Sequence, residues 1–170
     1  MKIENWDLLR VLTGHNLADI SVSRYYSFPR CSGLVIKCSN VYNVCPGKVV
    51  CVGQYNGYYD VSVLVNDTQM IRYCNLLSVS CKLNDVLGIR GLVGTCKDST
   101  RFEYCTQDKG SSDWAVRIGS SCWYKQNPEL LMQNKPVLTI TIEDDTTGQP
   151  YSYVDISKST DYEFTGSKGD

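Results

Sequence analysis

Short runs of β-forming residues, separated by turn residues, recur along most of this chain. Residues 58–65 (YYDVSVLV) alternate with a period of two and then meet a turn signal at Asn66-Asp67. Similar runs occupy residues 20–25, 33–37, 48–52, 70–74, 86–89, 92–96, 101–106 and 114–118. Strands spaced by about 8 to 12 residues with turns between them are typical of an antiparallel sandwich or barrel. The sequence therefore predicts a mainly β fold.

Two short segments have helical patterns instead. Residues 5–14 begin at a capping Asn5 and end at Gly14. Residues 127–132 place Asn127 at the cap and Pro128 at the first helical position. The pattern predicts a short N-terminal helix and a second helical turn near residue 130.

The C-terminal residues have a different pattern. Residues 137–142 and 151–156 are β-like and flank the polar stretch 143–148, which predicts a β-hairpin arm with a turn between its strands. The pair Asp144-Asp145 is interpreted as part of that turn rather than as a weak cation site. Residues 157–170 are polar, as in a flexible or partner-ordered tail.

Charge and hydropathy exclude two classes of partner. The chain has 170 residues, with 17 basic and 18 acidic side chains mixed along it. This balance has no basic footprint of the kind that nucleic-acid binding requires. No apolar run approaches the roughly 18 residues of a membrane span. Charges at Glu4, Asp7 and Arg10 interrupt any signal-peptide core, so we expect synthesis in the cytoplasm.

Nine cysteines occur without a single CxxC pair, which argues against a zinc ribbon. We expect reduced thiols that pack as small hydrophobic side chains rather than a disulfide framework. A thiolate metal site of Cys31 with Cys38 or Cys45, and a nucleophilic Cys31–His15 dyad, are alternatives that no spacing supports. His15 is the only histidine, and its place after a helix is typical of a surface or capping residue.

Five motifs follow one another between residues 31 and 132. They are Cys31–Val35 (CSGLV), Gly47–Gly53 (GKVVCVG), Arg72–Leu76 (RYCNL), Leu83–Gly94 (LNDVLGIRGLVG) and Ser99–Glu103 (STRFE). In this order the set resembles the lysostaphin-type zinc endopeptidase domain, also called the duplicated hybrid motif. The resemblance implies an antiparallel β fold for residues 31–134. It leaves residues 1–30 as an N-terminal helix and arm, and residues 135–170 as a C-terminal hairpin and tail for assembly.

The same resemblance implies a zinc site of two histidines and an aspartate, with a further histidine for catalysis. It places Cys31 and Val35 at the first histidine and the aspartate, Asn75 at the catalytic histidine, and Ser99 and Arg101 at the closing pair. Valine offers no donor atom, and arginine is permanently cationic. We therefore expect a pseudo-peptidase without metal or other cofactor. Glu103 beside Arg101 is interpreted as a charge pair at a strand edge.

The family's groove lies over the open sheet and is implied here to be lined by six side chains. They are Tyr55, Tyr58, Tyr73, Asn75, Arg101 and Tyr104. Twelve tyrosines against three phenylalanines favour surfaces that meet a protein or a glycan.

Degenerate domains of this kind with terminal arms resemble virion parts of tailed bacteriophages. The expectation is a non-catalytic structural protein of a phage tail tip or baseplate, or of a related contractile injection particle. It would be made in the host cytoplasm and assembled in several copies with other virion subunits. The alternatives are a peptidoglycan-binding module and an active cell-wall hydrolase with an atypical site.

Overall fold

The computed structural model describes residues 3–15, 20–27, 30–133, 142–145 and 154–155. Helical structure in this part of the chain is limited to α1 (Asn5–Thr13) and the 3-10 turn η2 (Pro128–Leu130). The longer strands are β2 (Val22–Ser27), β3 (Arg30–Lys37), β5 (Gly47–Tyr55), β6 (Tyr58–Asn66), β7 (Gln69–Val79), β9 (Leu92–Thr106), β10 (Trp114–Ile118) and β11 (Ser121–Gln126). The shorter strands are β1 (Ile3–Glu4), β4 (Asn40–Tyr42), β8 (Val86–Leu87), β12 (Met132–Gln133), β13 (Ile142–Asp145) and β14 (Val154–Asp155). The prediction of a mainly β, antiparallel fold is confirmed.

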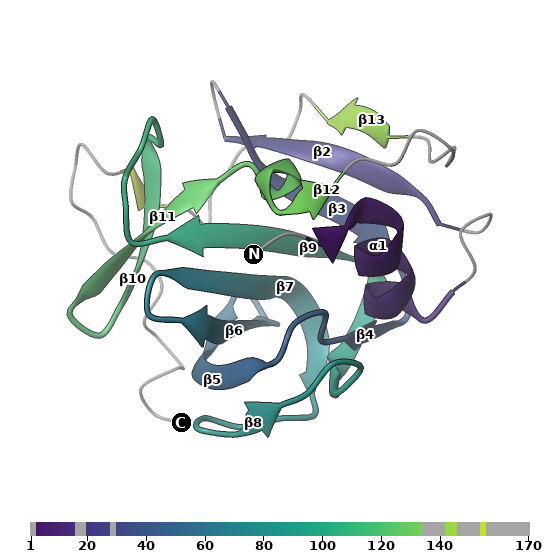
Figure 1. Ribbon diagram of the computed structural model, residues 1–170. Helices are drawn as coiled ribbons and strands as arrows, with labels where there is room; N and C mark the ends of the chain where they lie inside the picture. Colours follow the sequence, from purple (N-terminus) through teal and green to yellow (C-terminus); the bar gives the residue numbers. More distant parts are fainter. Residues whose placement is uncertain (1–2, 16–19, 28–29, 134–141, 146–153, 156–170) are drawn as a thin grey trace.

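One sheet dominates the molecule, in the order β13-β2-β3-β9-β7-β6-β5-β8 (Figure 1). Consecutive strands β5, β6 and β7 form an antiparallel meander. The β5–β6 turn is Asn56-Gly57, with φ of 52° and 83°. Positive φ at both residues is what a two-residue hairpin turn needs, and asparagine and glycine tolerate it best.

Strand β9 is the centre of this arrangement. It pairs with β7 along one edge and with β4, β3 and β11 along the other. The sequence predicts two strands here, 92–96 and 101–106, because the polar stretch 97–100 has the composition of a turn. That division is wrong: residues 92–106 form one strand, because neighbours on both edges satisfy its backbone hydrogen-bonding groups.

The helical predictions fit the structure closely. Helix α1 stops at Thr13, and Gly14 follows with φ of 72°, the left-handed conformation that favours glycine after a helix. The Asn127 side chain accepts a hydrogen bond from the Glu129 amide at 3.1 Å, and Pro128 opens the turn. The second segment is a single 3-10 turn rather than a longer helix. Strands β4 and β11 were not predicted.

The N-terminal segment belongs to the main core. Leu8, Leu9 and Leu12 of α1 are fully buried and pack in the same apolar cluster as Val22 of β2 and the central strands. The expected boundary at residue 31 is therefore wrong, because it falls within β3, which pairs with β2. No described helix is long and apolar enough to cross a membrane.

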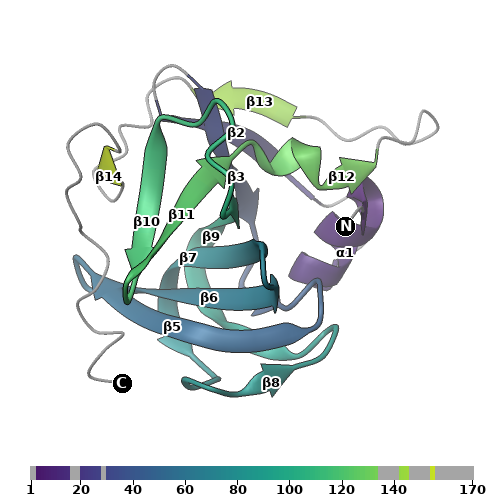
Figure 2. The same cartoon turned by 60° about the vertical axis from the view of Figure 1, so that its left-hand side comes forward.

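The C-terminal residues that the structure describes add strands at two separate places. Strand β13 pairs in parallel with β2, and β14 pairs with β10 (Figure 2). Residues 143–145 are thus in a strand rather than in the predicted turn. The rest of the predicted hairpin and the tail lie outside the described residues.

Candidate functional site

A buried cluster of charged side chains lies where β9 crosses its neighbours. At its centre is Glu103, which is fully buried in the middle of the sheet. Its carboxylate accepts hydrogen bonds from Arg72 Nη1 at 2.6 Å, from Arg101 Nε at 2.9 Å and from Lys125 Nζ at 3.1 Å. These donors come from β7, β9 and β11, so one carboxylate joins three strands. The predicted charge pair of Arg101 and Glu103 is therefore present, but it is buried within the sheet rather than at a strand edge.

The cluster extends from Arg72 towards β6. Arg72 Nη2 contacts Asp60 Oδ2 at 3.2 Å, and Arg72 Nε donates to Ser62 Oγ at 3.1 Å. The other oxygen of Asp60, Oδ1, accepts a hydrogen bond from the backbone N–H of Asn75 at 3.3 Å. Asp60, Arg72 and Glu103 each stand among apolar and aromatic residues, in YYDVSV, MIRYC and RFEYC. That position is the sequence signal that could have indicated a buried network, because a charge at an inward-facing strand position has to be paired.

Burial and charge oppose one another in this cluster. Burial alone would raise the pKa of Glu103, but the cations of Lys125, Arg72 and Arg101 lower it to about 2. Burial lowers the pKa of Lys125 to about 8 even though Glu103 opposes that shift. The two results agree physically, because Lys125 loses its hydration and also faces two guanidinium groups. The carboxylate is the member that the fold holds in its charged form.

The expected metal-binding positions Val35 and Arg101 do meet in the structure. They are directly opposite one another in the β3–β9 register. Arg101 is 2 % exposed, and its guanidinium carbon lies 5.0 Å from the centre of the Tyr25 ring. This cation–π contact and the bond to Glu103 fix a positive charge at this point.

Cys31 lies apart from that pair. It stands opposite Tyr26 in the β2–β3 register. Val35 lies four positions further along β3, a distance on the order of 13 Å at the usual rise of a strand. Within the described ranges no group of three or more histidine, cysteine, aspartate or glutamate side chains is placed to hold a metal ion. Burial raises the pKa of the Cys31 thiol to about 11, which opposes its use as a nucleophile.

Asn75 and Ser99 line one small polar pocket. The pocket has a volume of about 220 Å³ and also contains Tyr58, Lys97 and Asp98. Asn75 sits at an irregularity between β7 and β9 with φ of 65°, and asparagine is among the few residues that accept this conformation readily. The structure thus brings together the expected catalytic-histidine position, one member of the closing pair and one of the groove tyrosines.

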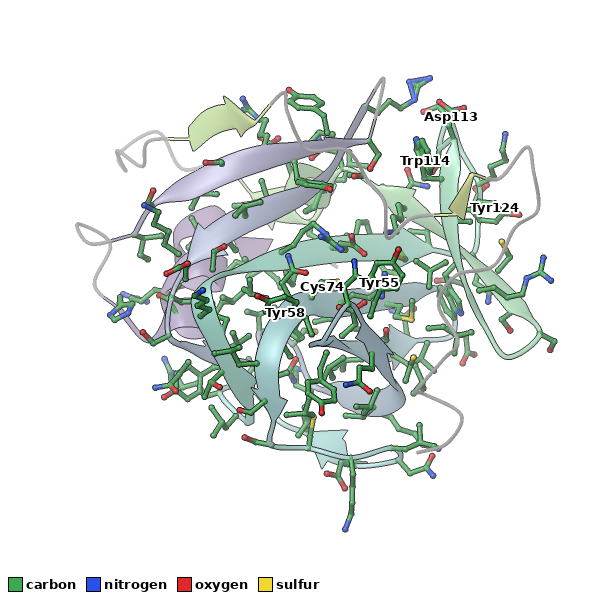
Figure 3. All side chains as sticks on the ribbon, turned by 180° about the vertical axis from the view of Figure 1, so that it is seen from behind. Tyr55, Tyr58, Cys74, Asp113, Trp114 and Tyr124 are labelled. Atoms are coloured by element: carbon green, nitrogen blue, oxygen red, sulfur yellow. The ribbon has the colours of Figure 1, made fainter. Side chains whose placement is uncertain are left out.

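The four tyrosines expected in the groove divide into two groups. Tyr55 and Tyr58 are partly exposed at the β5–β6 turn (Figure 3). Tyr73 is fully buried, donates from its hydroxyl to Asn43 Oδ1 at 2.8 Å and accepts the Val44 amide at 2.8 Å. It belongs to the core, so its assignment to the groove is wrong. Tyr104 is 7 % exposed and accepts from Gln69 Nε2 at 2.7 Å, which gives it a mainly structural role too.

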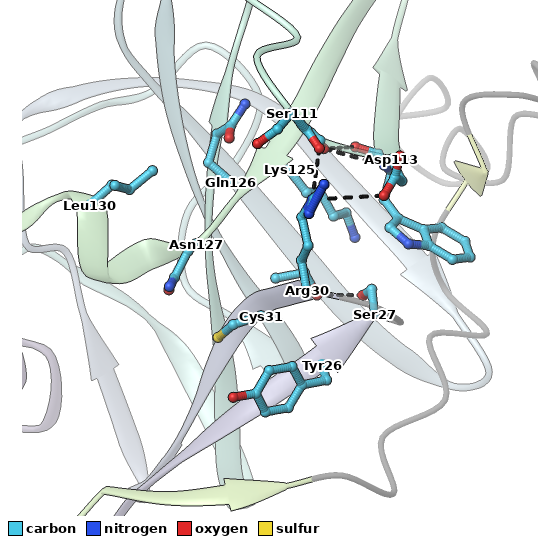
Figure 4. Close-up of a pocket in the computed structure, with 13 residues that line it drawn as sticks. Tyr26, Ser27, Arg30, Cys31, Ser111, Asp113, Lys125, Gln126, Asn127 and Leu130 are labelled. Atoms are coloured by element: carbon cyan, nitrogen blue, oxygen red, sulfur yellow. Dashed lines mark hydrogen bonds and ion pairs between the residues drawn. The ribbon is translucent and has the colours of Figure 1, made fainter.

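A second pocket, which the sequence did not indicate, opens beside Cys31 (Figure 4). It has a volume of about 350 Å³ and lies between the β2–β3 end, the loop at residues 111–114 and the end of β11. Arg30 at its edge donates from Nε to the Ser111 carbonyl at 2.8 Å. Lys125 lines this pocket as well as contacting Glu103, so the buried cluster reaches its wall.

The comparisons with known proteins show the fold. No protein-family model matches the sequence, and no curated protein matches it significantly. Among solved structures, lysostaphin superposes with a TM-score of 0.53 at 14 % identity, over 81 % of this chain and 61 % of that one. The chain therefore spans less than two thirds of lysostaphin.

Two other solved structures are similar with lower scores. A point mutant of the catalytic domain of the prophage-encoded M23 protein EnpA from Enterococcus faecalis gives a TM-score of 0.46 at 16 % identity, over 57 % of this chain and 88 % of that one. A chain of the SpoIIQ-SpoIIIAH pore forming complex gives 0.48 at 16 % identity, over 71 % and 87 %. The expected lysostaphin-type fold is confirmed by the lysostaphin superposition.

Proposed function

We propose that this protein is a non-catalytic binding or assembly protein built on a lysostaphin-type fold. The observation that supports this function is the pairing of Arg101 with Val35, at positions where the resemblance implies metal ligands. A guanidinium has no lone pair to offer a metal, and its fixed charge repels a divalent cation. Its contacts with Glu103 and Tyr25 hold it in place.

Zinc content and wall lysis test the loss of catalysis together. The full chain is produced in zinc-supplemented medium, dialysed against buffer and measured by elemental analysis. Its effect on the turbidity of purified sacculi is then compared with that of lysostaphin. We expect far less than one zinc per chain and no lysis. One tightly bound zinc per chain, or lysis at any rate above buffer, refutes the proposal.

For the biological setting, we infer a structural subunit of a bacteriophage tail tip or baseplate, or of a related contractile injection particle. Support comes from the resemblance between this domain and wall-degrading components of phage tails, and from the replacement of the residues that would do the chemistry. The protein would be made in the host cytoplasm and incorporated in several copies beside other virion subunits.

Particle composition tests that setting. Particles are purified from cells that carry either the full gene or a version lacking residues 136–170. We expect mass spectrometry to detect the full chain in particles and to find the truncated chain only as free folded protein. Normal incorporation of the truncated chain removes the assembly role of residues 136–170. Absence of the full chain from particles removes the setting itself.

The pocket of Tyr58, Asn75 and Ser99 favours one alternative, a peptidoglycan-binding module, because it keeps a polar recess at the expected active site. Retention on sacculi would be compared between Tyr58→Ala and Tyr124→Ala. Figure 3 shows Tyr58 near the middle of the view and Tyr124 at its right-hand side. Loss of retention in Tyr58→Ala alone favours this alternative, and no retention of the unchanged protein excludes it.

A further inference from the structure

Two cysteines that are distant in sequence touch one another in the core. Cys38 directly follows β3, and Cys96 lies in β9. Their Sγ atoms are 3.4 Å apart although 58 positions separate the residues along the chain. The Cys38 amide donates to the Asp98 carbonyl at 3.2 Å, and the Cys96 amide donates to the Ser39 carbonyl at 2.9 Å. The backbone therefore holds the two thiols in neighbouring positions.

The surroundings give the two thiols different roles. Cys38 is 7 % exposed and Cys96 is 5 % exposed, so each lies just beneath the surface. Either sulfur can donate in the hydrogen bond between the two thiols, and the Cys96 thiol also donates to the Cys38 carbonyl at 2.9 Å. The bond between the thiols lowers the pKa of Cys96, and the same bond, followed by burial, raises the pKa of Cys38. Cys96 is thus the more easily deprotonated of the two, and the thiolate is the reactive form of cysteine.

A fully buried thiol on a neighbouring strand gives the contrast. Burial raises the pKa of Cys74 well above its ordinary value. Cys74 also has 0 % exposure. The Cys38–Cys96 pair therefore lies closer to solvent than Cys74 does.

We propose that Cys38 and Cys96 form a site of reversible oxidation, which closes to a disulfide when the protein meets a hydroperoxide such as hydrogen peroxide. The Cys96 thiolate attacks one peroxide oxygen, an S–O bond forms, the O–O bond breaks, and the departing hydroxide takes up the thiol proton as water. Cys38 then attacks the Cys96 sulfenic acid, the S–S bond forms, and a second water leaves with the Cys38 proton. Two thiols and one peroxide thus give one disulfide and two waters.

The geometry requires little movement. Closing the bond brings the sulfur atoms from 3.4 Å to about 2.05 Å, a change within reach of side-chain rotation. The disulfide would join the β3–β4 connection to β9, next to Lys97, Asp98 and Ser99 of the small polar pocket. Cross-linking residues 58 positions apart restricts the unfolded chain, so we expect the oxidised protein to unfold at a temperature about 10 °C higher. This inference does not depend on the proposed function.

The test follows each thiol separately. The full, reduced chain is treated with graded hydrogen peroxide under native conditions, quenched by alkylation in denaturant and digested without reductant. We expect Cys38 and Cys96 to lose their free thiols together and to appear in one cross-linked peptide pair. Cys51, Cys74 and Cys105 should keep their free thiols through the peroxide treatment and therefore appear alkylated after the quench. Reductant should restore both thiols and lower the unfolding temperature again.

Single substitutions provide the matched controls. In Cys96→Ala, Cys38 should keep its free thiol and peroxide should no longer raise the unfolding temperature, whereas Cys81→Ala should behave like the unchanged protein. The proposal is overturned if peroxide leaves Cys38 and Cys96 as reduced as Cys74, or if either of them forms a disulfide with another cysteine. Should Cys96→Ala fail to fold, the peptide map of the unchanged chain decides by itself.

Discussion

Replacing Glu103 with glutamine should cost this protein a large share of its stability. The substitution keeps the shape of the side chain but removes the negative charge that Arg72, Arg101 and Lys125 share. The fold lowers the pKa of Glu103 from 4.5 to about 2. At about 1.4 kcal/mol for each pKa unit, this is about 3 kcal/mol of differential stabilisation for the charged form. Removing one partner of a buried ion pair costs about 3 to 5 kcal/mol in other proteins.

Urea unfolding at neutral pH, followed by tryptophan fluorescence, measures the effect. We expect Glu103→Gln to lose about 3 to 5 kcal/mol of unfolding free energy. Glu129→Gln is the matched control, because Glu129 contacts Arg24 at 2.8 Å but both side chains are about one-third exposed. That pair should contribute about 1 kcal/mol or less. A loss below about 1 kcal/mol in Glu103→Gln, or equal losses in both variants, would refute the argument that Glu103 holds the cluster together.

The pH dependence of stability in the same variant tests the direction of the Glu103 pKa shift. Because the pKa of Glu103 is lower in the folded protein, its contribution is fully present above about pH 4.5 and is lost as pH falls through about 2. The unfolding free energies of the unchanged protein and of Glu103→Gln should therefore converge between these values. Parallel curves down to the acid end would contradict the assignment.

Three further substitutions test other parts of the structure. The pKa of Lys125 is about 8 in the folded chain and 10.5 ordinarily, so the unfolded chain binds more protons between these pH values. The contribution of Lys125 to the unfolding free energy therefore rises with pH in this range. Lys125→Met should remove that rise when the unfolding free energies of the two proteins, measured in urea, are plotted against pH. Gly94→Ala should fail to fold or lose several kcal/mol of unfolding free energy in thermal unfolding, because the new Cβ would clash with the Ser78 carbonyl oxygen. Gly57→Ala is the control: open space surrounds its new Cβ, so its loss of stability reflects only the φ of 83°. Tyr73→Phe should cost about 1 to 3 kcal/mol in urea unfolding, because it leaves Asn43 Oδ1 and the Val44 amide without the hydroxyl; an unchanged midpoint would show that another group replaces it.

The sequence predicted strands and helix ends well where residues next to one another in the chain set the boundary. Residues 114–118 form β10 with the predicted bounds, and Gly14 and Asn127 take the predicted cap positions. The polar stretch 97–100 misled the prediction, because only the pairing of β9 with β3 and β7 shows that its backbone stays extended. Tyrosine is equally ambiguous from sequence alone: Tyr58 lines a pocket, whereas Tyr73 lies in the core.

The amino-acid sequence alone determined what the candidate site could not be. The resemblance implies a site that needs several histidines, and a chain with one histidine cannot supply them under any alignment. Only the tertiary structure decided what stands there instead. Charges at residues 60, 72, 103 and 125 are spread over four strands, and their mutual pairing depends on strand order and register. The same holds for Cys38 and Cys96: their contact is set by the packing of β3 and β9 and has no local signature in the sequence.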